Sequence, residues 1–364
     1  MPKRVITTIT AGSALLLLSA CGGVAAQGGG SDAVEMRITT MLPPDGASSD
    51  LIEWFADEIE TRTDGKVQPS VTYSGALLSG ADTLTGLAQG RAEAGLIAPA
   101  YFPADLPLNN VMMVPVTVSD REAHARALDD LAQDVPEVSA EFEDSGVVPI
   151  GYFPTATMTI TYDKKLSSLA DLQGAKLRIP SQPQAAVWEE LGVEPVFLAS
   201  EEVYEAVERG IINGVAYPLD TQVANGITEV AKTIVPDVGA SGGSVFTMSK
   251  TTFDALPDDV ASVVEELQGE WYDKGIEILV DYERQACEDF KAEDGTVLMW
   301  DDRDQATIED AIASSSPEDV WKKDAAGAGA DQGAIDQVWE QFNESLATYA
   351  AESTYPGLAE CASS

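Results

Sequence analysis

The sequence has little histidine, cysteine, lysine or arginine. Its 364 residues include one histidine, three cysteines and 21 basic residues, against 61 aspartates and glutamates. Structural zinc sites are built from Cys and His, so these counts exclude most of them. Nucleic acids and anionic membrane surfaces are bound by clustered Lys and Arg, which a formal charge of −40 disfavours. The acidic balance by itself indicates a solvated, highly soluble surface.

Familiar catalytic patterns are also missing. No S-x-x-K pair or phosphate-binding P-loop occurs. The single histidine, His124, lies in a charge-rich turn at residues 120–126, and we expect it on the solvated surface. Carboxylate pairs occur by chance among so many acids, so spacing nominates none. Nothing favours an enzyme, and we name no catalytic residue, metal ligand or cofactor.

The first twenty residues have the build of a secretory signal. Lys3 and Arg4 precede a short apolar stretch at residues 14–18, which is too short to span a membrane. Small residues followed by Cys21 resemble a bacterial lipobox, in which the cysteine receives a lipid and the peptide is cut before it. The alternative is ordinary cleavage with Cys21 incidental. Removal of residues 1–20 takes the formal charge from −40 to −42.

The predicted signal also bears on the residues that follow it and on the two remaining cysteines. Residues 21–33 are rich in Gly and read as a flexible link between a lipid anchor and a folded body that is extracytoplasmic. Cys287 and Cys361 remain in that body, and an even pair outside the cytoplasm is a disulfide candidate. Sequence alone does not show that the two sulfurs meet.

Strand-like and helix-like segments alternate along the body. Two such series, near residues 36–98 and 175–217, predict an α/β fold with largely parallel sheets. Strand-like segments at 147–152 and 157–162 lie between them and are candidates to run from one lobe to the next. Residues 252–293 read as mostly helical, and a helix of up to about 35 residues is long enough to bridge two lobes.

Arg178 lies where open α/β sheets place ligands, at the end of a predicted strand. Its guanidinium is a planar fork that can hold a carboxylate through two hydrogen bonds. Ser181 and the helix start after it offer hydroxyl and backbone donors. Residues 163–178 carry a local excess of Lys and Arg inside a strongly negative protein. The alternative is that Arg178 forms a structural ion pair with one of the many acids.

The run that begins at Leu177 resembles the substrate-binding proteins of TRAP transporters (tripartite, ATP-independent periplasmic), the DctP-like family. The family pattern is roughly L-R-I-P, then L-G-A-x-P-V, then E-V-Y-x-A-L-x-x-G-x-V-D-G. Its counterparts here are residues 177–180, 191–196 and 202–214, with the spacing kept over about 40 residues. Shorter matches at 55–60, 63–67, 77–80, 90–95 and 253–257 extend the resemblance over nearly all of the body.

The resemblance implies a two-lobed, periplasmic-binding-protein-like α/β clamp with crossover strands and a long interlobe helix. Lobe I would comprise residues 34–155 and 244–285, and lobe II residues 156–243 and 286–364 with the C-terminal helices. The clamp would close on a small organic acid, and Arg178 takes the place of the arginine that grips the substrate carboxylate. The loaded receptor would dock on membrane permease subunits driven by an ion gradient, without ATP, cofactor or catalysis.

Departures from the family pattern narrow the expected substrate. Sugar-acid-binding members carry a second arginine where this chain has Met158, and an asparagine where it has Tyr217. The segment 96–101 is mostly apolar and ends in Tyr101. These features favour a smaller or less polar monocarboxylate.

Four aromatic residues are pocket candidates on this reading. We expect Tyr101 and Tyr217 to line the pocket, with core packing as the alternative. Tyr73 and Trp188 are weaker candidates, since aromatics on such elements are more often core.

Two other classes of protein stay open. The receptor of an ABC importer closes in a similar way but lacks the long interlobe helix expected here. A secreted hydrolase is the more distant alternative. The sequence leaves the identity of the acid, the coupling ion and the oligomeric state open.

Overall fold

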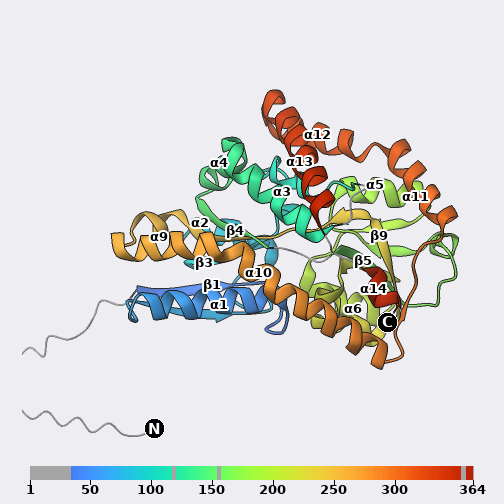
Figure 1. Ribbon diagram of the computed structural model, residues 1–364, viewed down its shortest axis with the longest axis horizontal. Coiled ribbons are helices and arrows are strands. Elements are labelled where there is room, and N and C mark those ends of the chain that lie inside the picture. Colours follow the sequence, from blue (N-terminus) through green and yellow to red (C-terminus); the bar gives the residue numbers. More distant parts are fainter. Residues whose placement is uncertain (1–33, 117–119, 154–156, 354–357, 364) are drawn as a thin grey trace, which may run out of the picture. The chain divides into compact units, whose positions relative to one another are not determined.

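The strands of the body gather into two mixed sheets (Figure 1). Each sheet packs against its own cluster of buried apolar side chains. The computed structural model describes residues 34–116, 120–153, 157–353 and 358–363. The first sheet has the order β2-β1-β3-β10-β4, and the second β11-β9-β5-β8-β6-β7. We call each sheet with its helices the first and the second lobe. The strands are β1 (Val34–Thr39), β2 (Val67–Thr72), β3 (Ala94–Ile97), β4 (Val147–Tyr152), β5 (Thr157–Tyr162), β6 (Lys176–Arg178), β7 (Glu194–Val196), β8 (Gly214–Pro218), β9 (Thr233–Ser241), β10 (Val245–Ser249) and β11 (Thr296–Val297).

The chain passes between the sheets twice through consecutive strands. Strand β4 of the first sheet leads to β5 of the second, and β9 of the second leads back to β10 of the first. Strands that arrive from the other lobe run against their new neighbours, so β5 pairs antiparallel with β8 and β9, and β10 with β3 and β4. The sheets are therefore mixed, where the sequence predicted largely parallel ones. The predicted crossover segments are confirmed as strands of different sheets.

The long helix predicted over residues 252–293 is confirmed as α10 (Asp258–Ala292), which has 35 residues. It contacts α1 and β4 of the first lobe, and α7 and α14 further along. Its buried positions recur at helical spacing, at Val260, Val264, Leu267 and Trp271. The Trp271 ring stacks on Phe246 of β10 with centroids 5.1 Å apart.

The other helices pack on one lobe or the other. They are α1 (Ala47–Arg62), α2 (Thr83–Ala88), α3 (Arg121–Asp134), α4 (Pro136–Asp144), α5 (Gln182–Glu190), α6 (Val203–Glu208), α7 (Leu219–Ala224), α8 (Ile227–Val230), α9 (Lys250–Asp254), α11 (Asp302–Ser315), α12 (Pro317–Ala328), α13 (Gln332–Glu352) and α14 (Leu358–Ser363). Among the described residues, no helix is long and apolar enough to cross a bilayer.

The C-terminal helices extend over both lobes. Helices α11 and α12 contact α5 of the second lobe, whereas α13 lies along α3 of the first. Trp321 of α12 is buried in the core that includes α3, and its Nε1–H donates to the Pro107 carbonyl over 2.9 Å. The predicted assignment of all of residues 286–364 to lobe II stays a prediction, and these contacts favour placing α13 with lobe I.

His124 is buried, so the prediction of a surface histidine was wrong. Only 2% of the residue is exposed, and its ring meets Phe342 of α13 edge-on with centroids 5.4 Å apart. Burial lowers the pKa of His124 to about 4, so the ring is neutral at ordinary pH. The reason is tertiary, because α13 covers the face of α3 that carries His124 from more than 200 positions further along the chain.

A disulfide joins Cys287 of α10 to Cys361 of α14. The Lys291 ammonium also donates to the Cys361 carbonyl over 2.8 Å, so this hydrogen bond adds to the disulfide in holding α14 to the end of α10. The predicted signal at residues 1–20, the tether at 21–33 and the lipidation candidate Cys21 lie outside the described residues.

Candidate ligand-binding site

A cavity lies between the two lobes and has about 620 Å³ of empty space, including the part open to solvent. Loops that follow β1 and β3 supply one wall, and the ends of β6 and β8 supply the other. The crossover between β9 and β10 closes one side. Its lining residues are Met41, Leu42, Ser48, Ala98, Ala100, Tyr101, Met113, Met158, Arg178, Pro180, Ser200, Tyr217, Pro218, Thr221, Gly242, Gly243 and Ser244.

Arg178 is the cation among these lining residues. It ends β6, beside Val215 of β8, and only 2% of the residue is exposed. Its Nε–H donates to the Leu198 carbonyl over 3.1 Å, and Nη1 to the Ala216 carbonyl over 3.2 Å. Nη2 donates to the Tyr101 hydroxyl over 3.4 Å.

The Tyr217 ring braces the guanidinium from one side. The guanidinium carbon of Arg178 lies 4.3 Å from the Tyr217 ring centroid, which is close enough for a cation–π interaction. Carbonyls, a hydroxyl and a ring therefore hold the head group in one orientation.

Part of the hydrogen-bonding capacity of Arg178 is left over. A guanidinium has five N–H donors, and the three bonds above leave one N–H on each terminal nitrogen. Within the described ranges, no Asp or Glu forms an ion pair with Arg178. The alternative of a structural ion pair therefore finds no partner among these residues. A buried positive charge without a carboxylate is costly, and an anionic ligand in the cavity would offset that cost.

Two further polar atoms of the cavity are buried without a hydrogen-bond partner in the described chain. They are the hydroxyl oxygens of Ser200 and Tyr217. Buried polar groups are usually paired, so each is a candidate contact for a bound molecule. Ser200 was missed from the sequence. Its only signal was its place just before the E-V-Y motif, at the start of a helical turn.

The structure brings some predicted site residues together and separates others. Tyr101, Met158, Arg178 and Tyr217 line the cavity. Ser181 does not; it caps α5 by accepting from the Gln184 N–H, and it lines a neighbouring hollow.

Two predicted aromatics also lie elsewhere. Tyr73 follows β2, and its hydroxyl donates to Glu53 of α1. Trp188 is fully buried in the core of the second lobe, where its Nε1–H donates to Asp237 over 2.8 Å.

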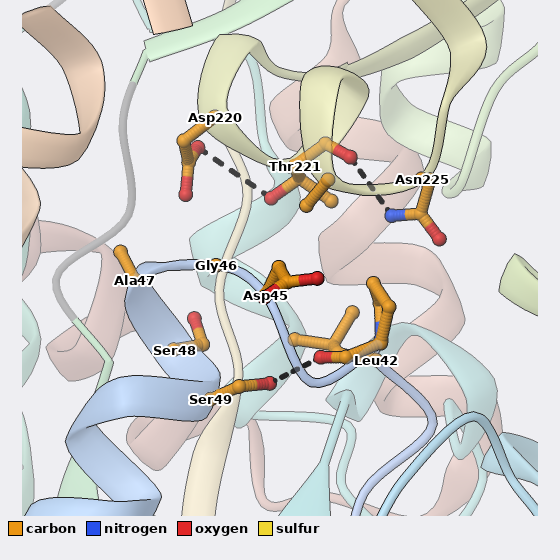
Figure 2. A pocket seen from close by; sticks show the side chains of 11 residues that line it. Leu42, Asp45, Gly46, Ala47, Ser48, Ser49, Asp220, Thr221 and Asn225 are labelled. Carbon is orange, nitrogen blue, oxygen red and sulfur yellow. Dashed lines mark hydrogen bonds between the residues drawn. The ribbon is translucent and has the colours of Figure 1, made fainter. Parts of the chain in front are cut away.

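An acidic hollow adjoins the cavity (Figure 2). It lies between the loop before α1 and helix α7, and it shares Leu42, Ser48 and Thr221 with the cavity lining. Asp45 and Asp220 are its charged residues. Burial raises the pKa of Asp220 to about 6, so the carboxylate is largely ionised at pH 7.

Across the described ranges, no three or more His, Cys, Asp or Glu side chains are grouped so as to hold a metal ion.

A two-lobed α/β fold with crossover strands and a buried arginine in an interlobe cavity is typical of extracytoplasmic solute-binding proteins. The model of bacterial extracellular solute-binding protein family 7, DctP, matches residues 40–322. The chain therefore belongs to this family, and the family predicted from the sequence is confirmed.

Named relatives agree with this class. A solute-binding protein of Verminephrobacter eiseniae is 25% identical over 226 residues, which are 61% of this chain and 66% of that protein. Another, of Albidiferax ferrireducens, is 24% identical over 69% of this chain and 77% of its own length. The chain thus matches just under two thirds of the first relative's length.

Solved structures share the fold. The sugar acid binding protein DctPAm of Advenella mimigardefordensis, in complex with galactonate, superposes with a TM-score of 0.78 at 19% identity, covering 86% of this chain and 99% of that one. DctP7 of Bordetella pertussis, which binds pyroglutamic acid, gives 0.76 at 19% identity, covering 85% and 100%. A TRAP solute binding protein of Desulfovibrio salexigens with bound orotic acid gives 0.75 at 21% identity, covering 85% and 99%.

Proposed function

We propose that this protein is the extracytoplasmic receptor of a TRAP transporter and captures a small monocarboxylate through Arg178. The carboxylate accepts hydrogen bonds from the two remaining N–H groups of the guanidinium. Tyr101 and Tyr217 border the bound acid, and the Ser200 and Tyr217 hydroxyls bond to polar groups near its carboxylate. Met158, in the place of a second arginine, presents an apolar surface to the rest of the molecule.

The observation that carries this proposal is the buried, unpaired guanidinium of Arg178. It faces an interlobe cavity, keeps one free N–H on each terminal nitrogen, and has no carboxylate partner among the described residues. Two parallel N–H groups match the two oxygens of a carboxylate. A ligand carboxylate would supply the missing negative charge.

Two observations support one carboxylate rather than two. Arg178 is the lining cation of the cavity, and the adjoining hollow carries Asp45 and Asp220 instead of a basic residue. A second carboxylate reaching that hollow would meet like charge. Pyroglutamate, orotate and galactonate, bound by the structural relatives, each carry one carboxylate.

A thermal-shift screen tests the proposal, because a ligand that binds only the folded state raises the melting temperature. The processed protein is mixed with monocarboxylates, including these three acids, with dicarboxylates such as succinate, and with primary amides of the same acids. At least one monocarboxylate should raise the melting temperature, while its amide and the dicarboxylates leave it unchanged. A response to amides equal to that of the acids would contradict the role of Arg178.

The location and the partner belong to the same proposal. Lipidation of Cys21 would anchor the body to the membrane, and residues 21–33 would let it reach permease subunits. Cys21→Ser should move the protein from the membrane fraction to the soluble fraction; an unchanged distribution would exclude the lipid anchor. Co-purification of two multi-span membrane proteins without an ATPase would distinguish a TRAP system from an ABC importer.

A further inference from the structure

The two lobes carry the same structural unit at the cavity. In the first lobe a 3-10 turn η1 (Gly80–Asp82) leads into α2 and then β3. In the second, η5 (Ser200–Glu202) leads into α6 and then β8, so the second unit begins 120 residues after the first. Gly80 and Ser200 are thus equivalent positions, each the first residue of a helical turn.

Each of these turns is capped from the opposite lobe. The first N–H groups of a helical segment have no acceptor inside it. The Gly80 N–H donates to Glu201 Oε1 of the second lobe over 3.1 Å. The Ser200 N–H donates to the Tyr101 hydroxyl of the first lobe over 2.9 Å. The two caps are therefore reciprocal, and both span the gap between the lobes.

The two caps touch each other through Gly80 and Tyr101. A Cβ added to Gly80 would lie 2.6 Å from Cε2 of the Tyr101 ring and 2.7 Å from the Met41 sulfur. The ring therefore rests directly against the Gly80 backbone. Across the gap the same ring meets Phe197 edge-on, with centroids 5.7 Å apart. A shift of either cap would disturb the other.

The Tyr101 hydroxyl also connects the caps to the ligand site. It accepts from Nη2 of Arg178 as well as from the Ser200 N–H, which uses both of its acceptor sites. Burial raises the pKa of Tyr101 above its ordinary value, so the hydroxyl keeps its own proton. That proton is available to an oxygen bound beside Arg178. The Tyr101 hydroxyl oxygen therefore takes part both in the ligand site and in the contact between the lobes.

We propose that these reciprocal caps form an interlobe latch, made by Gly80, Tyr101, Ser200 and Glu201, that sets how long the captured acid is held. Glu201 does not line the cavity, so it acts on the ligand only by holding the lobes together. This inference rests on the function proposed above. It assigns an affinity-determining role to a residue that has no contact with the ligand.

The test compares dissociation rates of the full processed protein and three variants. Glu201→Ala removes the acceptor of the Gly80 N–H. Glu201→Gln keeps an acceptor oxygen without the charge. Glu205→Ala is the matched control, because Glu205 lies on α6, is 65% exposed by side chain and forms only a surface ion pair with Arg209. Stopped-flow fluorescence follows release of pyroglutamate, orotate and galactonate, each tested separately.

The latch predicts a selective effect on release. A partly exposed hydrogen bond to an ionised acceptor corresponds to about three- to tenfold in an equilibrium constant. Glu201→Ala should therefore speed dissociation by roughly that factor, with association and the unfolding midpoint without acid unchanged. Glu201→Gln should stay within about twofold of the wild-type rate, and Glu205→Ala should match it.

Each outcome decides between the proposals. If the wild type binds an acid and Glu201→Ala releases it at the wild-type rate, the latch is refuted while the proposed function stands. If Glu205→Ala accelerates release equally, the effect is one of net charge and the latch is again refuted. If the wild type binds none of the three acids or any other monocarboxylate in the screen, the proposed function fails and the latch fails with it.

Discussion

Replacing Arg178 by methionine should abolish tight binding while the fold persists. Methionine keeps an unbranched apolar side chain against the Tyr217 ring but removes the charge and every donor. The substitution leaves the desolvated carboxylate of the ligand without its counter-charge. Removing one partner of such a pair typically makes binding less favourable by about 2–5 kcal/mol. At 1.4 kcal/mol per factor of ten, Kd rises by about thirtyfold to several thousandfold.

The fold should tolerate this change. Methionine leaves the Leu198 and Ala216 carbonyls without their donors, which is unfavourable by about 1–3 kcal/mol for each group that stays buried and unpaired. It also removes a buried charge that has no carboxylate partner in the described chain, which offsets part of that loss. Circular dichroism and the urea midpoint check that the variant is folded.

Isothermal titration calorimetry measures the affinity for whichever acid shifts the wild-type melting temperature most. Arg178→Lys separates the effect of charge from that of geometry, because a lysine ammonium is a point charge without the planar fork. The affinity of the Arg178→Lys protein should fall between those of the wild type and the Arg178→Met protein. Lys176→Met is the matched control, since Lys176 is an exposed cation on the same strand, β6. Binding by the Arg178→Met protein within about threefold of the wild type would refute the assignment, because that difference is below 1 kcal/mol.

Charge, protonation and the disulfide give three more expectations. The processed body is strongly negative, so the association rate of an anionic ligand should rise as NaCl is raised from very low levels; a falling rate in stopped-flow measurements would contradict this. Burial raises the pKa of Glu141 to about 7, and of Asp220 and Asp237 to about 6, above their unfolded values. The stability that these three carboxyl groups contribute when protonated is therefore fully present below about pH 4 and is lost as pH rises through 6 to 7. Urea midpoints should increase on acidification from pH 8 to 5, and Asp237→Asn should make the midpoint depend less on pH. Replacing Cys287 and Cys361 by serine should lower the free energy of unfolding by about 4 kcal/mol, because their loop spans 74 residues; an unchanged urea midpoint would show that the bridge is dispensable.

Local pattern was sufficient for much of the fold. The alternation of strands and helices, the crossover segments and the long helix α10 were predictable because each depends on residues close in sequence. Sheet direction was not, because β5 and β10 run antiparallel only as a result of where the chain crosses between lobes. The position of α13 could not be predicted either, because nothing near His124 in the sequence shows that Phe342 covers it.

The candidate site divides in the same way. Arg178 stood out through its motif and its place at a strand end. Ser200 did not, because its significance is that its hydroxyl lies buried in an interlobe cavity without a partner. Tyr73 was a weaker pocket candidate than Tyr101, and its hydroxyl bonds to Glu53 of helix α1 instead.

The sequence by itself determined the family, the two α/β series and the arginine nominated for the candidate site, because motif spacing and hydrophobic periodicity are local properties. Only the tertiary structure decided that the guanidinium of Arg178 is buried without a carboxylate among the described residues, and that Gly80 and Ser200 are capped from opposite lobes. Those facts depend on contacts between segments more than seventy residues apart, such as Arg178 with Tyr101 and Gly80 with Glu201. No local pattern encodes which distant group a buried donor will meet.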